Sequence, residues 1–298
     1  MSSPRFDRTW LGLAAAAALV AGGCVDIMQA AQFVDREDKK FAVTGKPDVT
    51  LSTFDGSIEI RPTDRREVAV TIEKRGVNKE ATDRIDVHAE QNGNQIAVEV
   101  RWPKGTMIGF AWHNSASAKL IVSMPAASDL HARTGDGSID VERLTGAIEL
   151  RSGDGSIHGR ALSGDIKAQT GDGSIKLEDV NGSLDVNTGD GSVTIDGKLT
   201  AVRARSGDGS VAIQAAPGSA AEADWTITTG DGSVDLRLPE GFNAELDAHT
   251  GDGSIVLHDL TLSNVTGRVG RNTLRGRLGA GGRAVNVRTG DGTITLRR

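Results

Sequence analysis

The chain of 298 residues is poor in cysteine and in aromatic residues. Cys24 is its only cysteine, which excludes a disulfide within one chain. Aromatic residues make up 3 % of the sequence and tyrosine is absent, so two neighbouring tryptophans stand out against the rest. The apolar run from Leu11 to Ala21 has eleven residues, whereas a mature membrane-spanning helix needs about 20. These absences argue against a disulfide scaffold and against a mature spanning helix at this place.

Residues that would mark an enzyme or a cofactor site are also scarce. The six histidines are scattered, and none has a tight metal-binding spacing. The sequence contains neither a phosphate-binding loop nor a nucleophile elbow. We therefore expect no cofactor, no nucleic-acid partner and no enzymatic activity. A polysaccharide-cleaving β-helix enzyme is the least favoured alternative, because it would need paired carboxylates or a basic residue in a cleft.

What the chain has in abundance is one repeated phrase, Thr/Ser-Gly-Asp-Gly-Ser-Ile/Val. Its first five aspartates follow one another at a constant spacing of 18, the later spacings are 23, 21 and 39, and a clipped form occurs around Asp55. We interpret the spacing of 39 as 18 plus 21, with one repeat having lost its signature. A period of about 20 residues is typical of solenoids and other repeat architectures. The aspartates of the phrase are Asp136, Asp154, Asp172, Asp190, Asp208, Asp231, Asp252 and Asp291.

Each repeat contains two arms of about nine residues in which apolar and polar residues alternate, as in half-buried strands. A second, looser turn separates the arms, as at Leu144-Thr145-Gly146. This pattern predicts an all-β fold, a single-stranded parallel β-solenoid or β-helix of 18-residue coils with two short strands each. The handedness of crossover connections favours a right-handed coil. An antiparallel meander with Asp-Gly hairpins is the alternative, although open sheets rarely exceed about 10 strands.

The corner residues of the phrase have separate predicted roles. Glycine allows positive φ and close approach, and each aspartate is expected to cap its own turn. The Thr or Ser before each Gly-Asp-Gly shares the parity of the inward residues, so we expect a hydroxyl ladder inside the corner. Calcium bound between turns is a disfavoured alternative, because the second turns carry no repeated acid.

The N-terminal residues predict an exported lipoprotein. Residues 1–24 resemble a lipoprotein signal peptide, in which small residues precede Cys24, the expected site of lipid attachment. An ordinary signal peptide or a short membrane anchor is the alternative. Val25 does not match the inner-membrane retention signal of enteric bacteria, so outer-membrane anchoring, facing the periplasm or the cell surface, is favoured. Residues 25–40 are expected to form a polar tether.

Residues 41–298 are expected to form one solenoid domain. Residues 41–130 would supply irregular N-terminal coils and a cap, and residues 131–298 the regular repeats. The end of the domain from Asn264 carries eight arginines and one acid, which could attract anionic lipid or acidic polysaccharide. Because a parallel rod has open ends, end-to-end self-association is a further possibility.

An aromatic loop interrupts the strand pattern between residues 101 and 117. It contains Trp102, Phe110 and Trp112, which form a candidate binding loop for glycan or protein. The alternative is that this loop folds over the open end of the solenoid and plugs its core.

The Gly-Asp-Gly-Ser ladder, the Leu-x-Leu-Pro that precedes it and the ending around Thr266–Asn272 resemble DUF4097, a family of unknown function described as adhesins by analogy. The resemblance covers roughly residues 48–298. It implies a β-solenoid that is often exported or membrane-tethered, and it supplies no catalytic residues. We therefore expect a non-enzymatic, adhesin-like or scaffold lipoprotein of the bacterial cell envelope that binds glycan or protein. An envelope-stress accessory protein acting through a membrane partner is the alternative.

Overall fold

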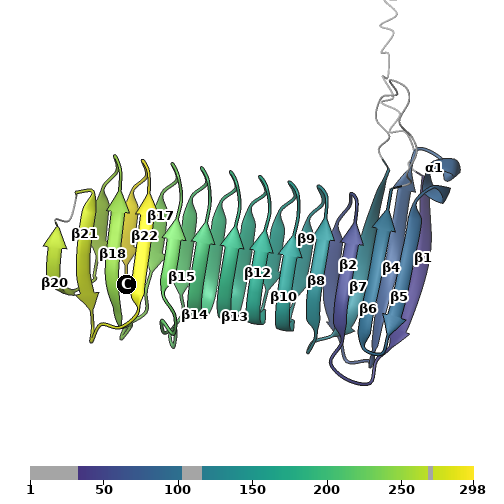
Figure 1. Cartoon of the computed structure of the whole chain (residues 1–298), viewed down its shortest axis with the longest axis horizontal. Helices are drawn as coiled ribbons and strands as arrows, with labels where there is room; N and C mark the ends of the chain where they lie inside the picture. The colour runs from purple at the N-terminus through teal and green to yellow at the C-terminus, as the bar shows by residue number, and fades with distance from the viewer. Residues whose placement is uncertain (1–32, 103–115, 268–270) are drawn as a thin grey trace, which may run out of the picture. The chain divides into compact units, whose positions relative to one another are not determined.

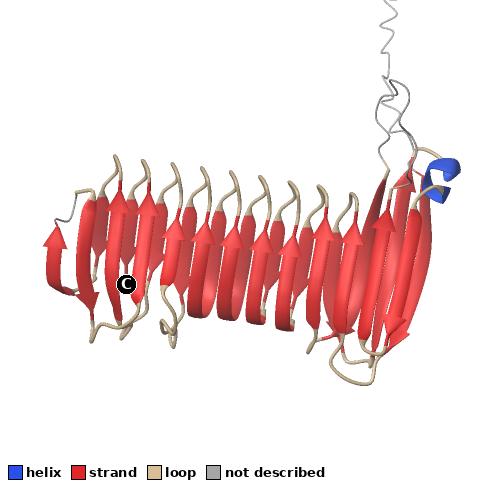
Figure 2. Cartoon of the chain, viewed as in Figure 1, coloured by secondary structure: helices blue, strands red, loops and turns tan. Residues whose placement is uncertain are grey.

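The computed structural model describes residues 33–102, 116–267 and 271–298, and these residues are almost entirely β-strand (Figures 1 and 2). All 23 strands of the described residues are connected through one large, mostly parallel sheet. The only helix found there is α1 (Lys79–Asp83), whose first turn is capped by the Asn78 side chain. No helix of the described residues is long and apolar enough to cross a membrane.

The strands stack in two columns that meet at the Gly-Asp-Gly corners (Figure 1). Each column is named after its central strands: those of the leading column lead into a corner, and those of the trailing column leave it. In order of pairing, the leading column consists of β5 (Asp86–Asn92), β6 (Gln95–Arg101), β2 (Asp48–Thr53), β8 (Asp129–Thr134), β10 (Thr145–Arg151), β12 (Ser163–Gln169), the second halves of β13 (Ile175–Asn187) and β14 (Val193–Arg205), β16 (Trp225–Thr228), β22 (Ala284–Thr289), β18 (Ala244–Thr250), β21 (Thr273–Leu278) and β20 (Leu262–Gly267). The trailing column consists of β1 (Phe33–Ala42), β4 (Glu67–Gly76), β7 (Ser117–Pro125), β3 (Ile58–Thr63), β9 (Ile139–Glu142), β11 (Ile157–Arg160), the first halves of β13 and β14, β15 (Val211–Ala215), β17 (Val234–Arg237), β23 (Ile294–Arg297) and β19 (Ile255–His258).

The central strands pair in parallel with the register that the sequence repeat predicts. Ile148 lies opposite Ile166, and Ile157 lies opposite Ile175, so each residue faces its equivalent in the next repeat. The antiparallel meander is therefore not formed in this block, and the prediction of an all-β chain with mainly parallel strands is confirmed. Among the described residues the antiparallel pairings occur only towards the two ends, in β1–β4, β4–β7, β5–β6, β18–β21 and β20–β21.

The core lies between the two columns and follows the alternation of the sequence. Inward residues of both columns form one continuous buried cluster. Trp225 is fully buried in it and packs edge-on against Phe242, with ring centroids 5.1 Å apart. The inward Ile, Val and Leu positions predicted from the alternation, such as Ile139, Ile175 and Val202, are almost completely buried.

The order of strands in space departs from their order in the chain at both ends. Near the N-terminus, β2 lies between β6 and β8, and β3 lies between β7 and β9. Near the C-terminus, β22 lies between β16 and β18, and β23 lies between β17 and β19. Each end of the described sheet is thus built by strands that return and insert between strands from other parts of the chain.

This insertion corrects our interpretation of the spacing of 39. The corner of Asp291 lies between those of Asp231 and Asp252, since Gly290 N donates to Gly230 O and Gly251 N donates to Gly290 O. The intervening residues contain the antiparallel hairpin β20–β21. The interpretation as a lost repeat is therefore wrong, because the last repeat is placed by long-range pairing that a sequence spacing does not encode.

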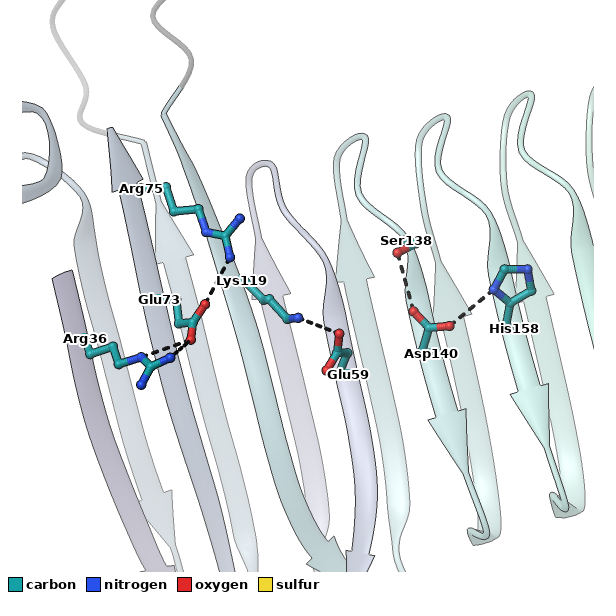
Figure 3. A network of polar contacts seen from close by, with 8 residues as sticks. All are labelled: Arg36, Glu59, Glu73, Arg75, Lys119, Ser138, Asp140 and His158. Atoms are coloured by element: carbon teal, nitrogen blue, oxygen red, sulfur yellow. Dashed lines mark hydrogen bonds and ion pairs between the residues drawn. The ribbon is translucent and has the colours of Figure 1, made fainter. Parts of the chain in front are cut away.

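The predicted tether is also corrected. Residues 33–40 belong to β1, which pairs antiparallel with β4 along its whole length. Several charged side chains of β1 have partners: Arg36 binds Glu73, which also accepts a bond from Arg75 (3.2 Å; Figure 3). Glu37 lies 3.1 Å from Lys74 and 2.8 Å from Lys39. These contacts explain how a segment with the composition of a linker forms a strand.

Candidate binding groove

A ladder of hydroxyl groups joins the Gly-Asp-Gly corners, as the sequence predicts. The Thr170 hydroxyl donates to the carbonyl of Gly155 (2.8 Å), and that of Thr188 donates to Gly173 (2.8 Å). The other members of the ladder, which make the same bond to the second glycine of the adjacent corner, are Thr134, Ser152, Ser206, Thr229, Thr250 and Thr289. The ladder ties each corner to the next and explains why the residue is a threonine or serine.

The glycines of these corners are required mainly by close stacking. A Cβ atom on Gly173 would lie 2.2 Å from the backbone oxygen of Gly155, and one on Gly155 would lie 2.1 Å from that of Gly137. Positive φ is instead found at the glycines of the second turns, such as Gly146 and Gly164. Close stacking therefore applies at both corners of the coil, since a Cβ on Gly164 would lie 2.2 Å from the backbone oxygen of Gly146, whereas positive φ is found mainly at the second turns.

The aspartates of the corners form an exposed row. All eight, from Asp136 to Asp291, are exposed, whereas Asp55 is half-buried. Burial, and secondly the charge of Asp136, raises the pKa of the Asp55 carboxyl. The turn is capped by the hydroxyl ladder, as where Ser152 Oγ accepts from Gly155 N (3.0 Å). No set of three or more His, Cys, Asp or Glu side chains in the described ranges is placed to hold a metal ion.

Beside the corners, the leading column carries a groove of about 950 Å³. It crosses six strands, β6, β2, β8, β10, β12 and β13, close to where each ends. Because neighbouring strands lie about 4.8 Å apart, the groove extends over roughly 24 Å. Most of the residues that line it have polar side chains, and those with the larger side chains are Phe54, Glu99, Arg101, Trp102, Arg133, Arg151, Gln169 and Asn187.

One end of the groove has an aromatic surface. Trp102 follows β6 and is half-buried, and its ring lies 5.4 Å from that of Phe54 at an interplanar angle of 57°. Both rings pack partly against the core. This packing fixes the orientation of the Trp102 ring while part of the side chain stays accessible in the groove.

The charges of the groove are partly neutralised by its own acids. Arg101 binds Glu99, and this bond lowers the pKa of the Glu99 carboxyl below its usual value. Arg151 lies 2.5 Å from Glu149. Of the three arginines that line the groove, Arg133 is the one for which the described part of the chain supplies no acidic partner.

Elsewhere on the outer surface, charged side chains tend to pair along and across strands. One row of the leading column alternates in sign as Glu149, Lys167, Asp185 and Arg203. On the trailing column, Lys119 binds Glu59, and Asp140 lies 3.2 Å from His158 (Figure 3). The surface outside the groove therefore has much of its charge satisfied internally.

The structure places only part of the predicted binding loop. Trp102 lies in the groove, whereas Phe110, Trp112 and the predicted lipid site Cys24 are outside the described residues. Sequence reasoning missed Phe54, Arg133 and Arg151. The signal that could have found the two arginines is their shared position directly before the hydroxyl ladder.

The arginine-rich C-terminal segment is partly neutralised. Arg275 lies 3.1 Å from Asp247, Arg277 lies 2.7 Å from Glu245, and Arg297 lies 2.6 Å from Asp235. These acids come from β17 and β18, beside which the basic strands pair. The arginine count of this segment alone therefore overstates its attraction for anions.

Comparison with known proteins gives one family and several distant structures. A family model described as Toastrack DUF4097 matches residues 48–297. A "putative cell adhesion protein" from Clostridium sporogenes is 15 % identical, with 89 % of this chain and 99 % of that chain covered and a TM-score of 0.28. A "putative adhesin" from Bacteroides fragilis is 11 % identical, with 88 % and 97 % covered and a TM-score of 0.31. A "putative lipid binding protein" from Parabacteroides distasonis is 14 % identical, with 88 % and 96 % covered and a TM-score of 0.39. No curated protein matches.

Proposed function

The chain belongs to the Toastrack DUF4097 family, and from this premise we propose that it is a non-enzymatic, adhesin-like scaffold of the bacterial cell envelope. Its function would be to bind envelope or surface glycan, or an envelope protein, along one face of a repetitive β-structure. We assign no catalytic step to it.

The scaffold would be a right-handed β-solenoid of 18-residue coils. The parallel register of the central strands and the hydroxyl ladder support this arrangement. Stacked coils suit a binding protein because they hold side chains at fixed intervals on a stiff surface.

The observation that carries the binding proposal is the groove at Trp102. A fixed aromatic ring, arginines and amide side chains line one continuous depression. An aromatic ring offers a flat apolar surface, and the polar groups around it can hydrogen-bond the hydroxyls of a sugar. The aromatic ring at one end of the groove would thus supply most of the affinity, and the polar groups along the groove would orient the bound glycan.

A lipid on Cys24 would hold this surface at the membrane. Residues 25–32 would separate the lipid from β1, and the outer membrane is the favoured site because Val25 does not match the retention signal. Several acyl chains on one cysteine give firm anchoring, whereas a single chain gives weak and reversible binding.

The experiment that tests this function is a binding assay on a soluble form that begins at Val25, against a glycan array and a cell-envelope fraction. We expect saturable binding that does not depend on calcium. Binding only in the presence of calcium would indicate that the ligand binds at the exposed row of corner aspartates and not in the groove. An absence of binding to both glycan and envelope fraction would contradict the proposal.

A further inference from the structure

The groove also indicates the chemical class of its ligand. Resting on the proposed function, we infer that it binds a linear glycan that carries an isolated acidic sugar among neutral ones, with the carboxylate on Arg133 and a neutral sugar on Trp102.

Arg133 is the cation that remains available to a ligand. It lies at the end of β8, paired in register with Ser52 on one side and Arg151 on the other. Its side chain is exposed, and no acid of the described residues pairs with it. Arg151 is held by Glu149 and Arg101 by Glu99. A free guanidinium binds a carboxylate through two parallel hydrogen bonds, so one carboxylate on the ligand is enough to pair with Arg133.

The positions along the groove set the order of the contacts. Trp102 follows β6, which is separated from β8 by β2, so the aromatic and the cationic contacts are about 10 Å apart. On the other side of Arg151 come Gln169 and Asn187, which lie opposite each other on β12 and β13. Their amides donate and accept hydrogen bonds and carry no charge. The ligand therefore meets an apolar surface, one cation and then neutral polar groups.

A peptide fits this groove poorly. The strands β2, β8, β10 and β12 are each paired on both sides, so they offer no free edge to which a peptide could add as a strand. Phe54, Val100 and Trp102 are the apolar side chains among the lining residues and belong to one end of the groove, so few apolar side chains along the rest of it are available to a peptide. Sugar hydroxyls need no backbone partner and match this lining.

A densely charged polyanion is also disfavoured. The other two arginines of the groove have acidic partners already. The exposed carboxylates of Asp136 and Asp154 follow shortly after Arg133 and Arg151, at the adjoining corner. Closely spaced anions would be repelled by this row, whereas a single carboxylate at Arg133 would not need to approach it.

The test uses the full-length protein in detergent and three probes. The first is a linear gluco-oligosaccharide with one glucuronic acid, the second is the same compound with its carboxyl reduced to an alcohol, and the third is a polyuronate. We expect the single-acid probe to bind at least tenfold more tightly than the reduced one. Arg133→Gln should remove this tenfold preference, so that the variant binds the acidic and the reduced probe with similar affinity. The control Lys167→Gln, an exposed cation outside the groove, should change neither.

Three results would overturn the inference. One is equal binding of the acidic and reduced probes with no effect of Arg133→Gln. Another is tighter binding of the polyuronate with a steep salt dependence, and a third is competition by an acidic peptide. If the reduced probe still binds and Trp102→Ala abolishes its binding, the proposed function stands although the assignment of the acidic sugar fails. If no probe binds, the inference fails, and the envelope-fraction assay then decides on the proposed function separately.

Discussion

The central block of strands and the two ends of the sheet are built on different principles. Between β8 and β15 every strand is parallel to its neighbours and follows the order of the chain. At the ends, strands insert out of order and antiparallel pairs appear. The central block repeats one arrangement of strands that are close in sequence, whereas each end has its own arrangement, held together by contacts between distant residues.

Stabilising contacts and the candidate binding surface are distributed differently over these two regions. In the central block, glycine stacking and the hydroxyl ladder recur at every corner. The groove joins this block to the N-terminal end, where β6 brings Trp102 beside β2. A repetitive scaffold thus gains a distinct surface at the place where an irregular strand joins it.

Removal of residues 284–298 should have the largest effect. It deletes β22 and β23, which separate β16 and β17 from β18 and β19. We expect the residues from 244 onward to lose cooperative folding and to become sensitive to limited proteolysis. Removal of Arg298 alone, which leaves β23 complete, is the control. If the shortened chain lost only its last strands and stayed resistant from 244 to 267, the inserted order would be wrong.

Gly173→Ala should destabilise the central block by about 3 kcal/mol, because its Cβ would collide with backbone that cannot move away. Gly93 offers the contrast: its φ is +61°, but no atom lies within 4 Å of a Cβ built there. Gly93→Ala should therefore cost about 1 kcal/mol, from backbone strain alone. Urea unfolding of both variants measures the difference, and equal costs would show that close stacking is not the reason for the corner glycines.

Thr188→Val should cost about 1 kcal/mol, because a buried hydroxyl that donates to Gly173 O is lost while the shape is kept. The matched control is Thr194→Val, on an exposed position of β14, where a change within about 0.5 kcal/mol is expected. Thermal unfolding of the two variants compares the inner ladder with the outer surface. If Thr188→Val lost as little stability as Thr194→Val, the hydroxyl ladder would not contribute to stability.

A fall in pH below about 4.5 should lower the stability of the N-terminal end, whereas changes of pH near neutrality should not. The bond from Arg36, and secondly that from Arg75, lowers the pKa of Glu73 below its ordinary 4.5. A lowered pKa in the folded state means that the stabilisation is present above pH 4.5 and is lost as the pH falls through the folded-state pKa.

The measurement is the melting temperature of the wild type and of Glu73→Gln from pH 7 to pH 3. The variant should be less stable at pH 7 and should show a weaker pH dependence below pH 4.5. Parallel curves for the two proteins would mean that this ion pair does not hold β1 in place.

The sequence predicted the central block because its constraints are local. The alternation of Ile157 and its equivalents, the second turns and the hydroxyl ladder each recur once per repeat, so one repeat explains the others. The inserted position of β22 could not be predicted, since any corner phrase can stack on any other. The residues of β1 looked like a linker because side chains that pair with Arg36 and Glu37 lie on β4, far away in the sequence.

The groove was predictable only at Trp102. Trp102 could be singled out because aromatic residues are rare in this chain. Phe54 could not, because it belongs to the clipped form of the repeated phrase, far away in the sequence. That β6 lies next to β2 follows from pairing between distant residues, such as Val49 with Ile96. The availability of Arg133 depends on which neighbouring arginines have acidic partners, and only the structure specifies this.

The most direct test of the account is the affinity of Trp102→Ala for the tightest-binding glycan of the array. We predict a loss of about 30-fold in a variant that still unfolds cooperatively, since a half-buried aromatic anchor is worth about 2 kcal/mol to binding. Lys176→Ala, on the exposed face of the trailing column, should bind like the wild type. Unchanged binding by Trp102→Ala, or an equal loss in both variants, would contradict the claim that the groove is the binding surface.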